Sequence, residues 1–187
     1  SLESDASVSG IPAESEAGMH ILRHSAAHLL AQAVMELYPG ANPTIGPAIE
    51  NGFYYDFAME PIGEEDLRIV QKKMHELARK NLAVERVECS DSELSELFSA
   101  NPYKLEIIAD KLEDGGGSTI YRQGEWYDLC LGPHVASTSK LMNVRLTGRP
   151  GAYGGENKPR RQWERTRPLL HISEPTKRYA ISYAAFC

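Results

Sequence analysis

The chain has 187 residues, of which 42% are hydrophobic and 25% are charged, a composition typical of a globular domain and not of a disordered or fibrous chain. Three cysteines are too sparse for a disulfide framework, and no apolar run reaches the ~20 residues that span a bilayer. A net charge of −6 gives no long-range attraction for a polyanion. We therefore expect a cytoplasmic protein that makes no use of a membrane and whose affinity for any nucleic acid comes mostly from other interactions.

Charge and composition divide the chain into three segments. Residues 1–18 carry four acidic side chains and no Lys or Arg, which predicts a flexible acidic linker and excludes a signal peptide. Residues 155–187 hold seven basic and three acidic side chains and form an atypical basic tail of unpredicted structure. Residues 19–154 contain the helix and strand patterns, so we expect a single domain there.

The first half of this domain begins with a helix over Met19–Tyr38, which has no internal Gly or Pro and ends at Pro39-Gly40. Asn51-Gly52 lies between apolar and aromatic runs and predicts a tight hairpin within Pro43–Ala58. An amphipathic helix follows from Glu64, with acidic residues in its first turn and apolar residues at three- and four-residue steps.

The second half alternates short helical and strand patterns. Helices are predicted over Asp91–Phe98 and Pro102–Leu112. Strand-like segments are predicted at Val84–Val87, Thr119–Arg122, Trp126–Leu129 and Lys140–Leu146. Because the strands and helices do not alternate regularly, the pattern favours an α+β fold, an antiparallel sheet with packed helices, over a doubly wound fold.

Two histidines on the first helix are the first candidates for chemistry. His24 and His28 are four positions apart, so both imidazoles emerge on one face, one turn apart. This face lies almost opposite the Leu- and Ala-rich stripe of the helix, and its neighbours are small or apolar. A helix covered on two sides, with two titratable rings on the second side, predicts the wall of a cleft.

A thiol and an imidazole form the second candidate pair. Cys130 and His134 flank Gly132-Pro133, a turn that cannot be helical and can aim both side chains in one direction. Together with His24 and His28 they could ligate Zn²⁺ tetrahedrally or bind and activate a water without metal. The spacing leaves both alternatives open.

Four segments resemble the editing domain of bacterial-type threonyl-tRNA synthetase, in the same order and with similar separations. They are HSAAHLLAQAV (24–34), IGPAIENGFYYDF (45–57), PYKLEII (102–108) and YDLCLGPHV (127–135). The paired histidine and cysteine–histidine motifs also resemble those of the alanyl-tRNA synthetase editing domain and its free-standing relatives. The resemblance implies a two-layer editing-domain fold for residues 19–154.

The function implied by the resemblance is hydrolysis of mischarged seryl-tRNA(Thr), at the ester between serine and the terminal ribose. A pocket that recognises threonine also accepts serine, because the missing methyl group changes binding by only ~1–3 kcal/mol. A second, smaller site that excludes the β-methyl group restores accuracy. The implied partners are the acceptor end of serine-carrying tRNA(Thr) and, if the chain is a fragment, the rest of a threonyl-tRNA synthetase.

The resemblance also assigns site residues. The implied catalytic set is His24, His28, Lys104, Asp128, Cys130 and His134, and Tyr55 is a further candidate for lining the substrate pocket. We expect the two helix histidines to hold the ribose end and orient a water, with the cysteine–histidine pair positioning or activating it. Lys104 stabilises charge on an ester oxygen, and Asp128 fixes a neighbouring donor.

Metal use differs between the branches of this superfamily. The alanyl branch binds Zn²⁺ through the paired motifs, whereas the threonyl branch is taken to act without metal. We therefore expect no cofactor here. A bound zinc ion would have four ligands: His24, His28, Cys130 and His134.

The chain departs from the family pattern at two places. Leu131 occupies a position where the family often has Arg, and the sequence after Tyr153 no longer matches the family pattern. No motif of an ATP-dependent aminoacylation domain is present, so the chain is expected to be a synthetase fragment or a free-standing editor. Two alternatives remain: a zinc-dependent trans-editing deacylase of the alanyl type, and a catalytically inactive module that binds the acceptor end of tRNA.

Overall fold

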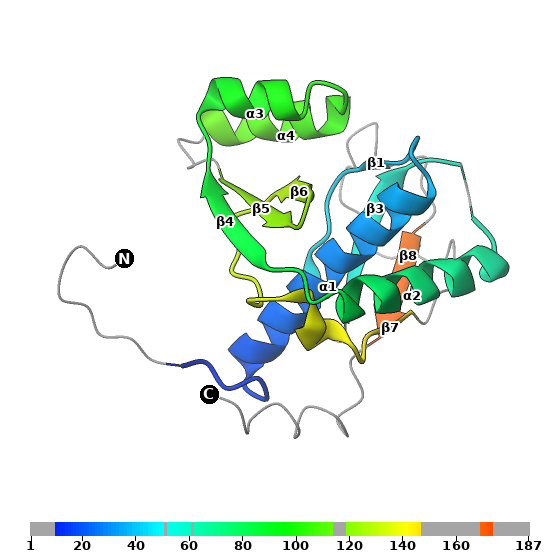
Figure 1. Cartoon of the computed structure of the whole chain (residues 1–187). Helices are drawn as coiled ribbons and strands as arrows, with labels where there is room; N and C mark the ends of the chain where they lie inside the picture. Colours follow the sequence, from blue (N-terminus) through cyan, green and yellow to red (C-terminus); the bar gives the residue numbers. More distant parts are fainter. Residues whose placement is uncertain (1–9, 51, 61, 114–118, 147–168, 174–187) are drawn as a thin grey trace.

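The computed structural model describes residues 10–50, 52–60, 62–113, 119–146 and 169–173 (Figure 1). Helix α1, Glu16–Leu37, begins three residues before the predicted start. The side chain of Ser15 accepts a hydrogen bond from the Gly18 amide, and Glu16 lies in the first turn, where an acidic side chain favours the helix dipole. Most of the predicted linker and tail lies outside the described residues, and the division into three segments stays a prediction.

The first sheet is built around one central strand. Its strands are β1 (Asn42–Pro43), β2 (Ala48–Ile49), β3 (Gly52–Ala58), β7 (Arg145–Leu146) and β8 (Leu169–Ser173). The order is β1-β3-β8-β7, β2 also pairs with β3, and every pairing is antiparallel. Ile49 pairs with Gly52, which confirms the predicted tight hairpin. Strand β8 belongs to the basic tail, for which the sequence predicted no structure.

Helix α1 lies at the centre of the molecule (Figure 1). It packs against β3 and against α2, Glu64–Arg79, and these elements share one apolar core. Side chains from Ser25 to Val34 are all buried. This confirms the expectation of a helix covered on two sides.

The first sheet, α1 and α2 make up one layer system, and a smaller sheet with two helices makes up the second. Strands β4 (Val84–Glu88), β5 (Thr119–Gln123) and β6 (Trp126–Leu129) are antiparallel in that order. Helices α3 (Asp91–Leu97) and α4 (Pro102–Glu113) lie together beside this sheet (Figure 1). A separate apolar cluster joins them to it: Leu94, Phe98, Ile108 and Ile120. The antiparallel sheets and packed helices confirm the α+β class.

The strand predicted over Lys140–Leu146 is mostly wrong. A 3₁₀ helix, η1, occupies Thr138–Leu141, and only Arg145–Leu146 forms a strand. The buried Thr138 hydroxyl donates to the Leu77 carbonyl at the end of α2 and accepts from the Leu82 amide, both at 3.0 Å. These tertiary contacts fold the segment against α2 and override its local β preference.

Two further expectations bear on the described residues. None of the helices in this part of the chain has the length and apolar character needed to cross a membrane. Cys89 and Cys130 are free thiols.

Candidate functional site

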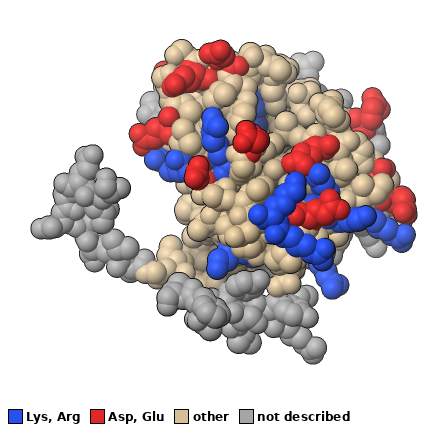
Figure 2. All heavy atoms as spheres, in the orientation of Figure 1, with Lys and Arg blue, Asp and Glu red and all other residues tan. Residues whose placement is uncertain are grey.

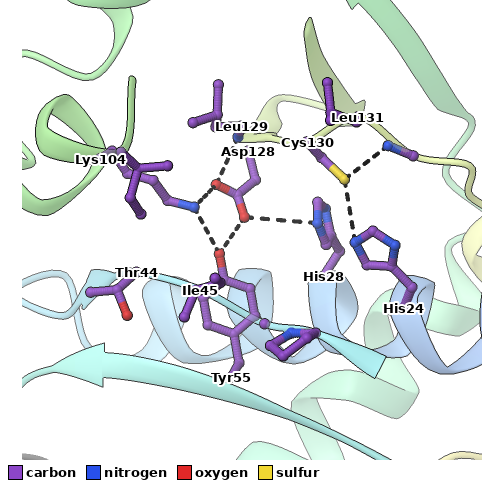
Figure 3. A pocket seen from close by; sticks show the side chains of 14 residues that line it. His24, His28, Thr44, Ile45, Tyr55, Lys104, Asp128, Leu129, Cys130 and Leu131 are labelled. Carbon is purple, nitrogen blue, oxygen red and sulfur yellow. Dashed lines mark hydrogen bonds and ion pairs between the residues drawn. The ribbon is translucent and has the colours of Figure 1, made fainter. Parts of the chain in front are cut away.

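A cavity of about 270 Å³ lies between the two layer systems. Six of the seven predicted site residues line it: His24, His28, Tyr55, Lys104, Asp128 and Cys130. They come from α1, β3, α4, β6 and the turn after β6, so five separate segments meet at this point (Figure 3). The volume is near the lower end of the ~300–1,000 Å³ typical of small-molecule sites, which suits a small group.

The charged part of the site is a buried ion pair. Lys104 Nζ lies 2.6 Å from Asp128 Oδ1, and the two side chains are only 3% and 2% exposed. The Tyr55 hydroxyl accepts a hydrogen bond from Lys104 Nζ at 3.0 Å and donates to the other carboxylate oxygen of Asp128. The Leu129 amide also donates to the carboxylate, at 2.8 Å. These contacts satisfy the carboxylate in a buried position, where an unpaired charge is costly.

Burial, together with the neighbouring carboxylate, keeps Tyr55 protonated. Burial, followed by the negative charge and the hydrogen bond of Asp128, raises the pKa of its hydroxyl well above the usual value. The hydroxyl therefore acts as a donor to Asp128 and an acceptor from Lys104, and it holds the ion pair in place.

The second part of the site is centred on a thiol. Cys130 Sγ lies 3.3 Å from His24 Nε2 and 3.1 Å from His134 Nε2, and it accepts from the Gly132 amide at 3.2 Å. Gly132 has φ +75°, and a Cβ there would lie 2.0 Å from the Tyr121 hydroxyl. Only glycine fits both the backbone conformation and the space, so this residue sets the direction of the turn.

His134 lies behind the cavity wall and does not line it, unlike the other six predicted residues. Its ring centroid is 4.2 Å from that of His28, 4.4 Å from that of His24 and 4.4 Å from that of Tyr121. His134 Nδ1 lies 3.2 Å from Ser25 Oγ. Any action of this ring on a substrate must therefore pass through Cys130 or its neighbours.

All three imidazoles have lowered pKa values. Burial is the largest cause in each case, followed by His20 for His24 and by His24 for His28. The pKa of His134 falls to about 2, because burial is joined by the nearby rings of His28 and His24. At neutral pH these rings are uncharged, so each starts with a lone pair that can accept a proton or bind a metal, and none starts as a cationic acid.

The ring–thiol cluster has the donor set of a metal site. The ligand atoms of His24, His28, Cys130 and His134 all lie within 4.8 Å of one another. A tetrahedral zinc ion with His and Cys ligands places its ligand atoms roughly 3.3–3.6 Å apart. Nδ1 of the buried His28 has no hydrogen-bond partner within the described residues. These residues could hold a metal ion.

Two residues that contact His134 were missed by the sequence interpretation. Ser25 is fully buried next to His24, and Tyr121 packs its ring on His134. A serine in an Ala- and Leu-rich helix and a tyrosine on the inner face of a strand carry no distinctive local signal. Their partners lie 109 and 13 positions away in the chain, and only the fold brings them together.

One known protein family matches part of this chain. The family described as "Threonyl and Alanyl tRNA synthetase second additional domain" matches residues 118–165. This segment includes Cys130 and His134.

Longer matches come from complete ligases. The chain is 49% identical over 147 residues to the threonine–tRNA ligase of Thermoplasma acidophilum, and 50% identical over 152 residues to that of Rubrobacter xylanophilus. The enzyme of Thiobacillus denitrificans is 44% identical over 156 residues. These alignments cover 76%, 80% and 81% of the chain but only 22–24% of the relatives. The chain thus belongs to the threonyl and alanyl tRNA synthetase second additional domain family and is homologous to the corresponding part of threonine–tRNA ligases.

Proposed function

We propose that this chain hydrolyses the ester bond of mischarged seryl-tRNA(Thr) and releases serine and uncharged tRNA. Homology to threonine–tRNA ligases supports the choice of tRNA. The main support for the choice of reaction is the site itself, where neutral imidazoles, a thiol and an ammonium group converge on one small cavity. Imidazoles take up protons, and the ammonium group stabilises negative charge, which are the two needs of ester hydrolysis.

In the proposed reaction, water attacks the carbonyl carbon, charge develops on the carbonyl oxygen, and the bond to the ribose oxygen breaks. His24 and His28 hold the ribose end and orient the water. The neutral ring of His24 takes the proton of the water and returns it to the ribose oxygen. Cys130, with His134 behind it, positions the water. Positioned acid–base groups of this kind accelerate hydrolysis by ~10²–10⁴-fold.

Lys104 stabilises the developing negative charge in this proposal. An ammonium group has three N–H donors. Two of these point to Asp128 and Tyr55, and the side chain forms part of the cavity wall. The third donor is available for an ester oxygen. Asp128 and Tyr55 then act by holding the ammonium group, and Tyr55 also lines the substrate pocket.

The same homology supports our proposals for the partners and the location. We propose that the chain binds the acceptor end of tRNA(Thr) in the cytoplasm and that it acts there as part of a threonyl-tRNA synthetase. On the face drawn in Figure 2, the Lys and Arg side chains of the described residues are interspersed with acidic ones. This mixed surface fits a domain that depends on its neighbours for most of the tRNA affinity.

We propose that hydrolysis proceeds without metal, as the resemblance to the threonyl branch implies. Cys130 Sγ already lies within hydrogen-bond distance of His24 Nε2, His134 Nε2 and the Gly132 amide, which supports this choice. In the alternative, His24, His28, Cys130 and His134 hold Zn²⁺, which would supply Lewis-acid activation. Elemental analysis and a chelator separate the two. If our proposal is right, metal-free protein should keep full activity. A zinc-dependent enzyme of the alanyl type would instead contain one equivalent of zinc per chain, lose activity on chelation and cleave seryl-tRNA(Ala).

Deacylation of serine- and threonine-charged tRNA(Thr) tests the proposed function. We expect faster release of serine, and loss of this activity in His24→Ala. His75→Gln is the matched control, because His75 is a partly buried histidine on α2 that contacts Gln71 and the Val144 carbonyl, away from the cavity. Binding of charged tRNA without turnover by the folded wild-type chain would favour the inactive module, and equal release of both amino acids would contradict the proposal.

A further inference from the structure

Ser25 links helix α1 to the turn that carries the thiol. Its side chain has no exposed surface. The hydroxyl oxygen lies 2.7 Å from the Ile21 carbonyl oxygen, 3.0 Å from the Val135 amide nitrogen and 3.2 Å from His134 Nδ1. The deacylation mechanism proposed above assigns no role to this residue.

The three contacts determine where each proton lies. A serine hydroxyl has one proton to donate and two lone pairs that accept. The Ile21 carbonyl can only accept, and an O···O distance of 2.7 Å is that of an O–H···O hydrogen bond, so the hydroxyl proton lies there. The Val135 amide can only donate. The remaining contact, with His134, must therefore use the second lone pair of Ser25, and His134 carries its proton on Nδ1.

We propose that Ser25 is a positioning residue that holds His134 in the Nδ1–H form and so orders the protons of the thiol cluster. Nε2 of His134 then presents a lone pair to Cys130 Sγ, 3.1 Å away, and the thiol proton points to it. His24 Nε2, 3.3 Å from the same sulfur, must donate its own N–H to it. His24 is left with its lone pair on Nδ1.

This arrangement deepens the proposed function. In the proposed reaction, the lone pair on His24 Nδ1 takes the proton of the attacking water. The Ser25 hydroxyl therefore determines which nitrogen of His24 acts as the base, although Ser25 does not touch the substrate. This consequence for activity rests on the proposed deacylation. The proton position on His134 rests only on the contacts of Ser25. The proposal therefore has one readout that is independent of activity.

The direct test is two-bond ¹H–¹⁵N NMR of the histidine rings in the metal-free chain, since the two neutral forms of the ring differ in their pair of ¹⁵N shifts. His134→Gln identifies the His134 signals. We expect the pure Nδ1–H form in the wild type and in Ser25→Thr, which keeps the hydroxyl. In Ser25→Ala the acceptor is lost, and the Nε2–H form should appear.

A matched control separates this effect from the loss of a helix contact. Ser95 on α3 donates to the carbonyl four residues earlier, at 2.8 Å, as Ser25 does, but its side chain is exposed and lies outside the ring–thiol cluster. Ser95→Ala should leave the His134 signals unchanged. The Nε2–H form in the wild type, or an unchanged Nδ1–H form in folded Ser25→Ala, would overturn the proposal. The wild-type spectrum decides the matter even if Ser25→Ala fails to fold.

Kinetics then test the consequence for activity. Loss of a group that orients an active-site histidine costs roughly 10–100-fold in activity. We expect this loss in kcat for Ser25→Ala, little change in KM, and rescue by Ser25→Thr. A wild-type chain with the expected His134 form but without deacylase activity would reject the proposed function alone. An active chain with His134 in the other form would reject the inference alone.

Discussion

Removing one charge from the Lys104–Asp128 pair should destabilise the fold strongly. Lys104→Met keeps most of the side-chain volume and deletes an ammonium group that lies 2.6 Å from the carboxylate. Breaking a buried pair in this way costs ~3–5 kcal/mol, because the remaining charge has no counterpart. Two neutral donors, from Tyr55 and Leu129, stay on the carboxylate. We therefore expect a loss near the lower limit, about 3 kcal/mol.

A double-mutant cycle measures the pair directly. Asp128→Asn leaves the ammonium group unpaired, and we expect a similar loss of about 3 kcal/mol. The double variant contains neither charge, so its loss should be well below the sum of the two. Urea unfolding of the four proteins, followed by circular dichroism, gives the free energies. Single losses that add within ~0.5 kcal/mol would show that the two residues act independently and would refute the reasoning.

Three further predictions concern single groups. Because the pKa of folded His134 is about 2 and its ordinary value is 6.5, stability is full above pH 6.5 and falls as the pH is lowered. At pH 5 this ring alone should cost about 2 kcal/mol, measured by urea unfolding of the metal-free chain. Tyr55→Phe removes the hydroxyl between Lys104 and Asp128 and should cost about 2 kcal/mol in the same measurement. Gly132→Ala places a methyl group against Tyr121 and should lower the thermal midpoint, with a strain of ~1–3 kcal/mol.

Each of these predictions has a clear contradicting result. Equal stability at pH 5 and pH 7 would mean that the folded imidazole titrates normally. Wild-type stability of the phenylalanine variant would remove the hydroxyl from the account of the ion pair. Gly40→Ala is the control for Gly132→Ala, since a Cβ at Gly40 meets nothing within 4 Å. Equal midpoints for these two variants would contradict the steric argument.

The elements with strong local patterns could be predicted from the sequence. The C-terminal end of α1, the hairpin at Gly52 and the amphipathic α2 all depend on signals within a few residues of one another. The start of α1 was missed because the Ser15 cap lies in a segment with linker-like composition. The 3₁₀ helix η1 was missed because contacts of Thr138 with distant backbone groups determine it.

The candidate site was predictable in its residue types but only partly in its arrangement. The spacing of His24 and His28 predicted a cleft wall, and both residues line the cavity. The burial of Lys104 against Asp128 and the position of His134 behind the wall depend on how two layer systems pack. No local pattern contains this information. The role of Ser25 was missed for the same reason, because its partners in the site belong to a turn about 110 positions further along the chain.

Titration with non-hydrolysable analogues is the most direct test of the central claim, that this cavity receives a serine ester. The probes are the 3′-amide analogues of seryl-adenosine and threonyl-adenosine. With the seryl analogue, we expect the NMR signals of His24, His28 and Lys104 to shift. The extra methyl group should weaken binding of the threonyl analogue at least ~10-fold. Shifts confined to residues outside the cavity, or equal affinities for the two analogues, would contradict the account.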